Sequence, residues 1–86
     1  MKAKIYDEIK TLVDISVDFD NRIIPKGILG TIVECYEEPQ EGYAVDLAIP
    51  DDRWVGGFDY ENVILFPEQF VVINPAVESP DVVRQY

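Results

Sequence analysis

Few residues of this 86-residue sequence could perform covalent or acid–base chemistry. The chain has no histidine and one cysteine, Cys35, so nucleophiles paired with histidine are excluded. Cys35 stands in an alternating strand-like run, TIVECY, where a buried thiol usually serves as a small hydrophobic side chain. We therefore predict no enzymatic activity and no catalytic residue.

The sequence also gives little support for a metal site or a phosphate-binding site. Asp51, Asp52 and Asp59 could converge on a cation, but their spacing matches no calcium-binding loop, and solvated turn acids are the better interpretation. Gly27 and Gly30 could form a phosphate-binding turn, which needs a following helix N-terminus or a Lys aimed at the phosphate. A strand is expected there, so backbone geometry accounts for both glycines. We predict no metal and no cofactor.

The charge balance narrows the class of partner. The chain has 17 acidic and 7 basic residues, a formal net charge of -10. Nucleic-acid affinity depends on Lys and Arg displacing counterions from phosphates, so a nucleic-acid partner is disfavoured, as is an anionic membrane. A basic protein would be attracted. The alternative is that the acidic residues only keep a small protein soluble.

An acidic hairpin with neighbouring aromatic residues is the sharpest positive feature. Aromatic side chains within a charged rim are typical of protein-binding surfaces. The residues predicted to bind a partner are Glu34, Tyr36, Glu37, Glu38, Glu41, Tyr43, Asp46 and Trp54. Trp54 could equally be a core residue, and we expect Phe58 in the core.

These residues depend on short strands separated by turn signals, a pattern typical of all-β proteins. Five strands are expected: 8–15, 30–37, 43–49, a fourth at 54–60 that is broken by Gly56-Gly57 and continued by 63–66, and 70–73. Between them we expect a long loop at 16–27, a hairpin connection at 38–42, a turn at 50–53 and a 3-10 turn at 67–69. A helix over 5–13 is an alternative, because apolar residues recur there at helical spacing. Phe19, Ile23 and Ile24 should anchor the long loop on the protein.

The order of these elements resembles a small five-stranded SH3-like barrel with a 3-10 turn before its last strand. The expected core is Leu12, Val13, Val33, Cys35, Val45, Leu47, Val63, Leu65, Phe70 and Val72.

The chain should form one domain, 1–74, followed by a C-terminal extension, 75–86. Val77, Val82, Val83 and Tyr86 are expected to dock on this chain or on a second copy, which would make a homo-oligomer. No apolar run suits a signal peptide or a bilayer span, so we expect no membrane association. A single cysteine fits the reducing cytoplasm.

The stretches KGILGTIVECY, GYAVDL and LFPEQFVVI, preceded by IYDEIKTLVDI, are similar to a family of very small bacterial proteins, common in cyanobacteria and known as a domain of unknown function. The resemblance covers roughly residues 5–73, and the sequence departs from it at 50–62 and after 74. It implies an SH3-like or KOW-like barrel and an antitoxin-like or immunity-like role.

Three functions follow as hypotheses. The first is a non-enzymatic acidic module that binds a basic protein partner, with neutralisation of a toxin as its most concrete form. The second is an accessory structural subunit of a larger photosynthetic or respiratory complex. The third is a KOW-like nucleic-acid-binding module, which the charge disfavours.

Overall fold

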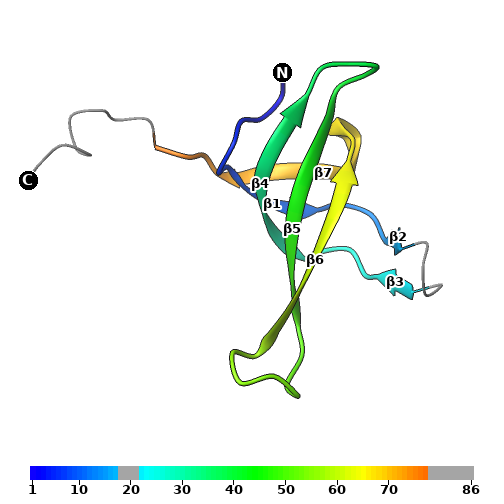
Figure 1. The fold of residues 1–86 in the computed structure, drawn as a ribbon, viewed down its shortest axis with the longest axis vertical. Coiled ribbons are helices and arrows are strands. Elements are labelled where there is room, and N and C mark those ends of the chain that lie inside the picture. The colour runs from blue at the N-terminus through cyan, green and yellow to red at the C-terminus, as the bar shows by residue number, and fades with distance from the viewer. Residues whose placement is uncertain (18–21, 78–86) are drawn as a thin grey trace, which may run out of the picture.

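The computed structural model describes residues 1–17 and 22–77, and these residues form an all-β fold (Figure 1). More than half of the described residues lie in extended strands, which are joined by turns and bends, with a 3-10 turn before the last strand. In chain order the elements are β1 (Glu8–Thr11), β2 (Ile15–Val17), β3 (Arg22–Ile24), β4 (Leu29–Tyr36), β5 (Gly42–Pro50), β6 (Phe58–Leu65), η2 (Pro67–Gln69) and β7 (Phe70–Asn74).

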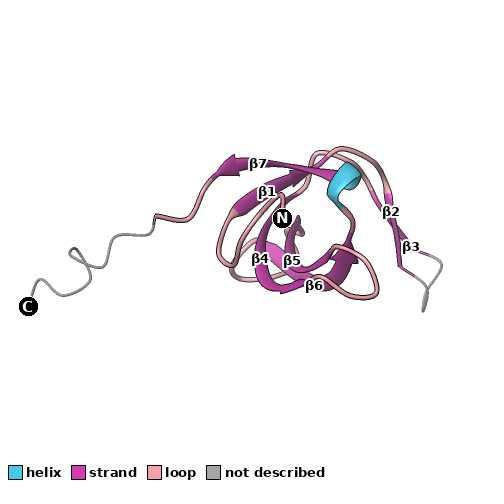
Figure 2. Cartoon of the chain, turned by 90° about the horizontal axis from the view of Figure 1, so that it is seen from above, coloured by secondary structure: helices cyan, strands magenta, loops and turns pink. Residues whose placement is uncertain are grey.

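Five of the strands form one antiparallel sheet in the order β6-β5-β4-β1-β7, and β2 and β3 form a separate two-stranded hairpin. The large sheet curls around the protein interior (Figure 2). It stays open, because β6 and β7 are its two edges. The expectation of a closed barrel was therefore wrong, although the all-β class is confirmed.

The central strand β5 shows how the sequence pattern positions the core. Tyr43, Val45 and Leu47 alternate with smaller or polar residues, and all three side chains are fully buried. Period-2 alternation sends these side chains to one side of the sheet. This predicted face is confirmed, and we call it the inner face. The opposite side of the sheet is called the outer face.

Strand β4 departs from simple alternation. Its pairing with β5 shifts between Ile32 and Glu34, so Val33 is an extra residue with no partner, a β-bulge. Before the bulge Ile32 points into the core and is fully buried, and after it Cys35 is the residue that packs against the core. The predicted common face for Val33 and Cys35 was therefore wrong.

The segment before β4 was also predicted incorrectly. Strand β1 ends at Thr11, and a bend follows it, so Leu12 and Val13 are exposed rather than in the core. The helix considered over 5–13 is absent from these described residues. The expected loop at 16–27 contains the hairpin of β2 and β3, in which Ile24 is buried and Ile23 exposed. Phe19 lies outside the described residues.

A turn replaces the first half of the strand predicted at 54–60. Gly56 and Gly57 lie in this β5–β6 turn, where Gly57 takes a φ of 81° that L side chains rarely adopt. Strand β6 then runs without a break into the predicted 3-10 turn, which is confirmed. The Phe66 amide donates to Gln69 Oε1 at 2.8 Å and caps that turn.

The core between the inner face and the β2–β3 hairpin is only partly the expected one. Val45, Leu47, Leu65 and Phe70 are fully buried as predicted. Cys35, Val63 and Val72 pack against the core from partly buried positions. The other buried apolar members of the core cluster are Ala3, Ile9, Ile15, Ile24, Ile32 and Tyr43.

The start of the C-terminal extension is tied to its own chain. The Ala76 amide donates a 2.7 Å hydrogen bond to Asp7 Oδ1, while Val77 is exposed. The docking predicted for Val82, Val83 and Tyr86 falls outside the described residues. No helix in the described part of the chain is long and apolar enough to cross a membrane.

Candidate binding surface

The Cys35 side chain behaves as a packing residue. Burial raises the pKa of its thiol, and the negative charges of Glu34 and Asp7 raise it further. The sulfur lies 3.9 Å from the Ala3 carbonyl oxygen. A protonated thiol with these neighbours is a poor nucleophile, because thiolate is the reactive form.

Gly27 and Gly30 are explained by backbone geometry, as predicted. Gly27 has a φ of 89°, a conformation that favours glycine. Gly30 lies on the inner face, where an added Cβ would come within 2.8 Å of side-chain atoms of Val45 and Leu47 and 2.9 Å of the Asp46 carbonyl oxygen. Gly27 precedes β4 and Gly30 lies within it, so within the described residues neither glycine leads into a helix N-terminus that could hold a phosphate.

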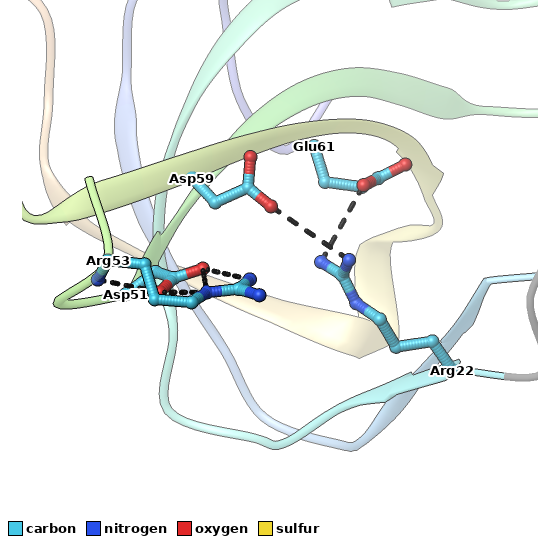
Figure 3. A network of polar contacts seen from close by, with 5 residues as sticks. All are labelled: Arg22, Asp51, Arg53, Asp59 and Glu61. Carbon is cyan, nitrogen blue, oxygen red and sulfur yellow. Dashed lines mark hydrogen bonds and ion pairs between the residues drawn. The ribbon is translucent and has the colours of Figure 1, made fainter.

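The acids of the β5–β6 region pair with arginines (Figure 3). Arg53 Nη2 lies 2.6 Å from Asp51 Oδ2, and Arg53 Nε donates to Asp51 Oδ1 at 2.9 Å. These bonds lower the pKa of Asp51 to about 2. Asp59 and Glu61 face Arg22 of β3, at 3.9 and 3.6 Å. Within residues 1–17 and 22–77, no group of three metal-ligating side chains could hold an ion.

The β4–β5 hairpin separates the predicted binding residues by face. Glu34 pairs with Ala44, and Tyr36 with Gly42. The side chains of Glu34, Tyr36 and Asp46 project from the outer face. They therefore lie on the opposite side of the sheet from the buried side chains of β5. Glu37 and Glu38 lie in the exposed connection beyond Tyr36. Glu34, Tyr36 and Asp46 therefore share one face, and Glu37 and Glu38 extend it at one end.

Tyr43 and Glu41 have a structural role instead. The Tyr43 ring is fully buried and meets Phe70 edge-on, with ring centroids 5.3 Å apart. Its hydroxyl donates to Glu41 and accepts from the amides of Lys2 and Ala3 at 2.9 and 3.2 Å. Burial raises the pKa of Tyr43, whereas the Tyr43 hydroxyl lowers that of Glu41. A partner could not contact the Tyr43 ring, so that prediction was wrong.

Trp54 lies far from the acidic hairpin. It belongs to the β5–β6 turn, and its side chain is 56% exposed. The β4–β5 and β5–β6 connections lie at opposite ends of the long strands (Figure 1). Trp54 is therefore a surface residue, but it does not join Glu37 and Glu38 in one site.

The structure shows a groove that sequence reasoning missed. It has a volume of about 540 Å³ and lies on the outer face, between the Tyr6 segment and the β5–β6 end of the sheet. Phe58, expected in the core, is 45% exposed and belongs to it. The groove is lined by Tyr6, Glu8, Gly27, Ile28, Leu29, Gly30, Thr31, Val33, Asp46, Ala48, Pro50, Phe58 and Tyr60.

A signal for this groove was present in the sequence. Phe58 and Tyr60 alternate with Asp59 and Glu61, and Leu65 is buried. Period-2 alternation with a core-facing Leu65 puts the aromatic rings on the outer face and the two acids on the inner side. Treating 54–60 as one strand broken by glycines concealed that alternation.

Comparison of the chain with protein-family models, with curated proteins and with solved structures finds no match to any of them. The chemistry of the surface itself therefore carries the functional argument. It offers carboxylates, aromatic rings and a groove, which are features that binding surfaces commonly have.

Proposed function

We propose that the protein is a non-enzymatic module that binds a protein partner through the outer face of its sheet, and that the partner presents a basic surface. The supporting observation is the set of carboxylates on that face. Glu34, Glu37, Glu38 and Asp46 form no ion pair with any residue that the structure describes. A basic partner would supply the missing cations.

The strand order supports an SH3-like fold as the frame for this function. A strand, a long loop with a small hairpin, three long antiparallel strands, a 3-10 turn and a last strand beside the first follow one another here. Such small sheets commonly carry binding surfaces. The resemblance to small bacterial proteins adds a narrower proposal, that the partner is a basic toxin which this module neutralises in the cytoplasm.

The test compares two charge reversals of equal size. Glu34→Lys changes an exposed carboxylate on the outer face, and Asp52→Lys changes an exposed carboxylate in the β5–β6 turn. Each raises the net charge by two. Proteins captured by the parent chain are identified, produced in pure form and titrated calorimetrically at low and high salt.

We expect Glu34→Lys to weaken binding about tenfold at low salt, since like charges across an interface repel. Asp52→Lys should weaken binding clearly less, because Asp52 lies in the β5–β6 turn, at the opposite end of the long strands from the connection that holds Glu37 and Glu38, and the interaction of exposed charges falls with distance. High salt should reduce the difference between the variants. Equal effects of both reversals, or an affinity independent of salt, would contradict the proposal.

A further inference from the structure

The outer face carries an ordered set of cross-strand rows. One row contains Glu8, Thr31, Asp46 and Asn62, and the next contains Lys10, Leu29, Ala48 and Tyr60. Pro50 and Phe58 form a third. Paired residues in such rows lie about 5 Å apart at Cβ, and diagonal ones about 7–8 Å. Asp46 is diagonal to Tyr60, so its carboxylate lies one row from the Tyr60 ring.

Three aromatic rings line the groove without contributing to the core. Tyr6, Phe58 and Tyr60 are 71%, 45% and 66% exposed, and the centroids of Phe58 and Tyr60 lie 6.4 Å apart. Buried area therefore does not explain their presence. They give the groove accessible ring faces, which attract cations through the ring quadrupole.

Tyr6 is held in an unusual backbone conformation. Its φ is 74°, a left-handed value that costs a non-glycine residue energy. The Tyr6 amide donates to the Ile32 carbonyl oxygen at 2.7 Å, beside the bulge at Val33. Backbone strain held by surrounding structure is concentrated at functional sites. Here it accompanies a ring that lines the groove.

The charged side chains of the groove are both acidic. Glu8 and Asp46 line it, and neither has an ion pair within the described ranges. Each accepts one hydrogen bond from a neutral side-chain amide, Asp46 from Asn62 at 2.7 Å and Glu8 from Asn74 at 3.2 Å. The basic residue of these rows, Lys10, lies beyond Leu29 and does not line the groove. Aromatic faces beside carboxylates favour a cationic guest.

We propose that the groove binds an arginine side chain of the basic partner, with the guanidinium stacked on Tyr60 and hydrogen-bonded to Asp46. This inference rests on the proposed function and names its contact. Arginine fits better than lysine, because its planar guanidinium stacks on aromatic rings and bonds carboxylates in pairs. The groove lining reaches Val33, which precedes Glu34 in β4, so the proposed arginine site adjoins the outer-face carboxylates of the proposed function.

The experiment titrates the isotope-labelled full chain with a capped Gly-Gly-Arg-Gly-Gly peptide by nuclear magnetic resonance. The same peptide with citrulline or lysine in place of arginine serves as the comparison. Citrulline keeps the shape and removes the charge. We expect saturable shifts confined to groove residues, and about tenfold weaker binding of the citrulline peptide. Lysine should bind with intermediate affinity.

Matched variants identify the contacts. Asp46→Asn should weaken the arginine peptide about tenfold, whereas Asp52→Asn, the same change outside the groove, should leave it unchanged. Tyr60→Leu should weaken binding several-fold, and Tyr60→Phe should retain it, because the ring face remains. Equal binding of the citrulline peptide, or equal effects of the two asparagine variants, would overturn the inference.

The outcome is separable from that of the proposed function. A partner that binds with Glu34-dependent, salt-sensitive affinity while the arginine peptide leaves the groove unshifted overturns the arginine site alone. An arginine peptide that binds the groove, with no basic protein captured by the chain, supports the site and overturns the broader proposal of a basic protein partner.

Discussion

Two regions of this molecule each place a tyrosine near an acidic residue, but one pair is packed into the structure and the other lines the groove on the outer face. Near the β4–β5 end, Tyr43 and Glu41 are fully engaged with the N-terminal residues Lys2 and Ala3. In the outer-face groove, Tyr60 is 66% exposed, and the half-buried Asp46 accepts a hydrogen bond from Asn62 and has no ion pair within the described residues. A tyrosine beside an acid is therefore not a binding site in itself. Its availability depends on the face to which the strand register assigns it.

The N-terminal segment explains why the first region is closed. The Lys2 ammonium lies 4.6 Å from the Phe70 ring centroid and donates to the carbonyl oxygens of Pro67 and Phe70. The Lys2 amide donates to Glu41 at 2.8 Å. These contacts pack the first residues over the Tyr43–Phe70 pair. No described segment covers the groove in the same way, and its aromatic residues Tyr6, Phe58 and Tyr60 remain 71%, 45% and 66% exposed.

The largest expected effect is the difference in unfolding free energy between alanine variants of Tyr43 and Tyr60. Tyr43→Ala should cost about 3–5 kcal/mol of unfolding free energy, because it removes a buried ring and leaves a cavity. Tyr60→Ala should change it by less than about 0.5 kcal/mol, as surface changes usually do. Urea denaturation followed by circular dichroism measures both.

If Tyr43→Ala does not fold, Tyr43→Phe provides the second measurement. Loss of the hydroxyl alone should cost about 1 kcal/mol, because the Lys2 and Ala3 amides lose an acceptor. Equal stabilities of the Tyr43 and Tyr60 variants would show that the assignment of these residues to core and surface is wrong.

A second prediction contrasts Asp7 with Asp46. Burial acts to raise the pKa of Asp7, but hydrogen bonds from the Ala76 and Lys4 amides, with the Lys4 ammonium 3.4 Å away, bring it below its ordinary value of 3.8. Because the folded pKa is lowered, the ionised Asp7 stabilises the fold above pH 3.8, and this stabilisation is lost as pH falls through the folded value.

Asp7→Asn should therefore lower the unfolding free energy by about 1–3 kcal/mol at neutral pH, since buried amides and a nearby cation lose a charged acceptor. The difference from the parent should shrink below the folded pKa of Asp7. Asp46→Asn, a change on the outer face, should leave stability nearly unchanged at neutral pH. Urea titrations at neutral and acidic pH test this, and a constant Asp7→Asn difference across pH would contradict it.

Much of the sheet was predictable because its signals are local. The alternation of Tyr43, Val45 and Leu47 identified the inner face, and Pro67 marked the 3-10 turn. The bulge at Val33 was not predictable, since it depends on pairing with β5 and has no composition of its own. Because of this extra residue, Ile32 takes the core position before the bulge and Val33 lies on the outer face, whereas Cys35 still packs against the core.

The binding surface was less predictable than the fold for a related reason. Sequence reasoning grouped Glu34 with Glu41 and Tyr43 because they are close along one hairpin. The register groups Asp46 instead with Thr31, Glu8 and Asn62, which come from three other strands. Cross-strand neighbours are set by tertiary pairing, which a single sequence does not show. Leu12 and Val13 illustrate the same limit, because a bend after Thr11 leaves both exposed.

The smallest expected effect concerns Asp51, whose carboxylate differs from those of the outer face in having a cation of its own. Hydrogen bonds from the Arg53 side chain lower the pKa of Asp51 to about 2. Arg53→Gln should return the pKa toward its ordinary value of 3.8, and a pH titration of the Asp51 carboxyl carbon by nuclear magnetic resonance measures the change. Arginine-peptide binding in the groove should be unaffected, because Arg53 lies in the exposed β5–β6 turn and does not line the groove. A large change in that binding would mean that Arg53 contributes to the groove. The distinction between Asp51, which has a cation of its own, and Asp46, which has none among the described residues, would then be wrong.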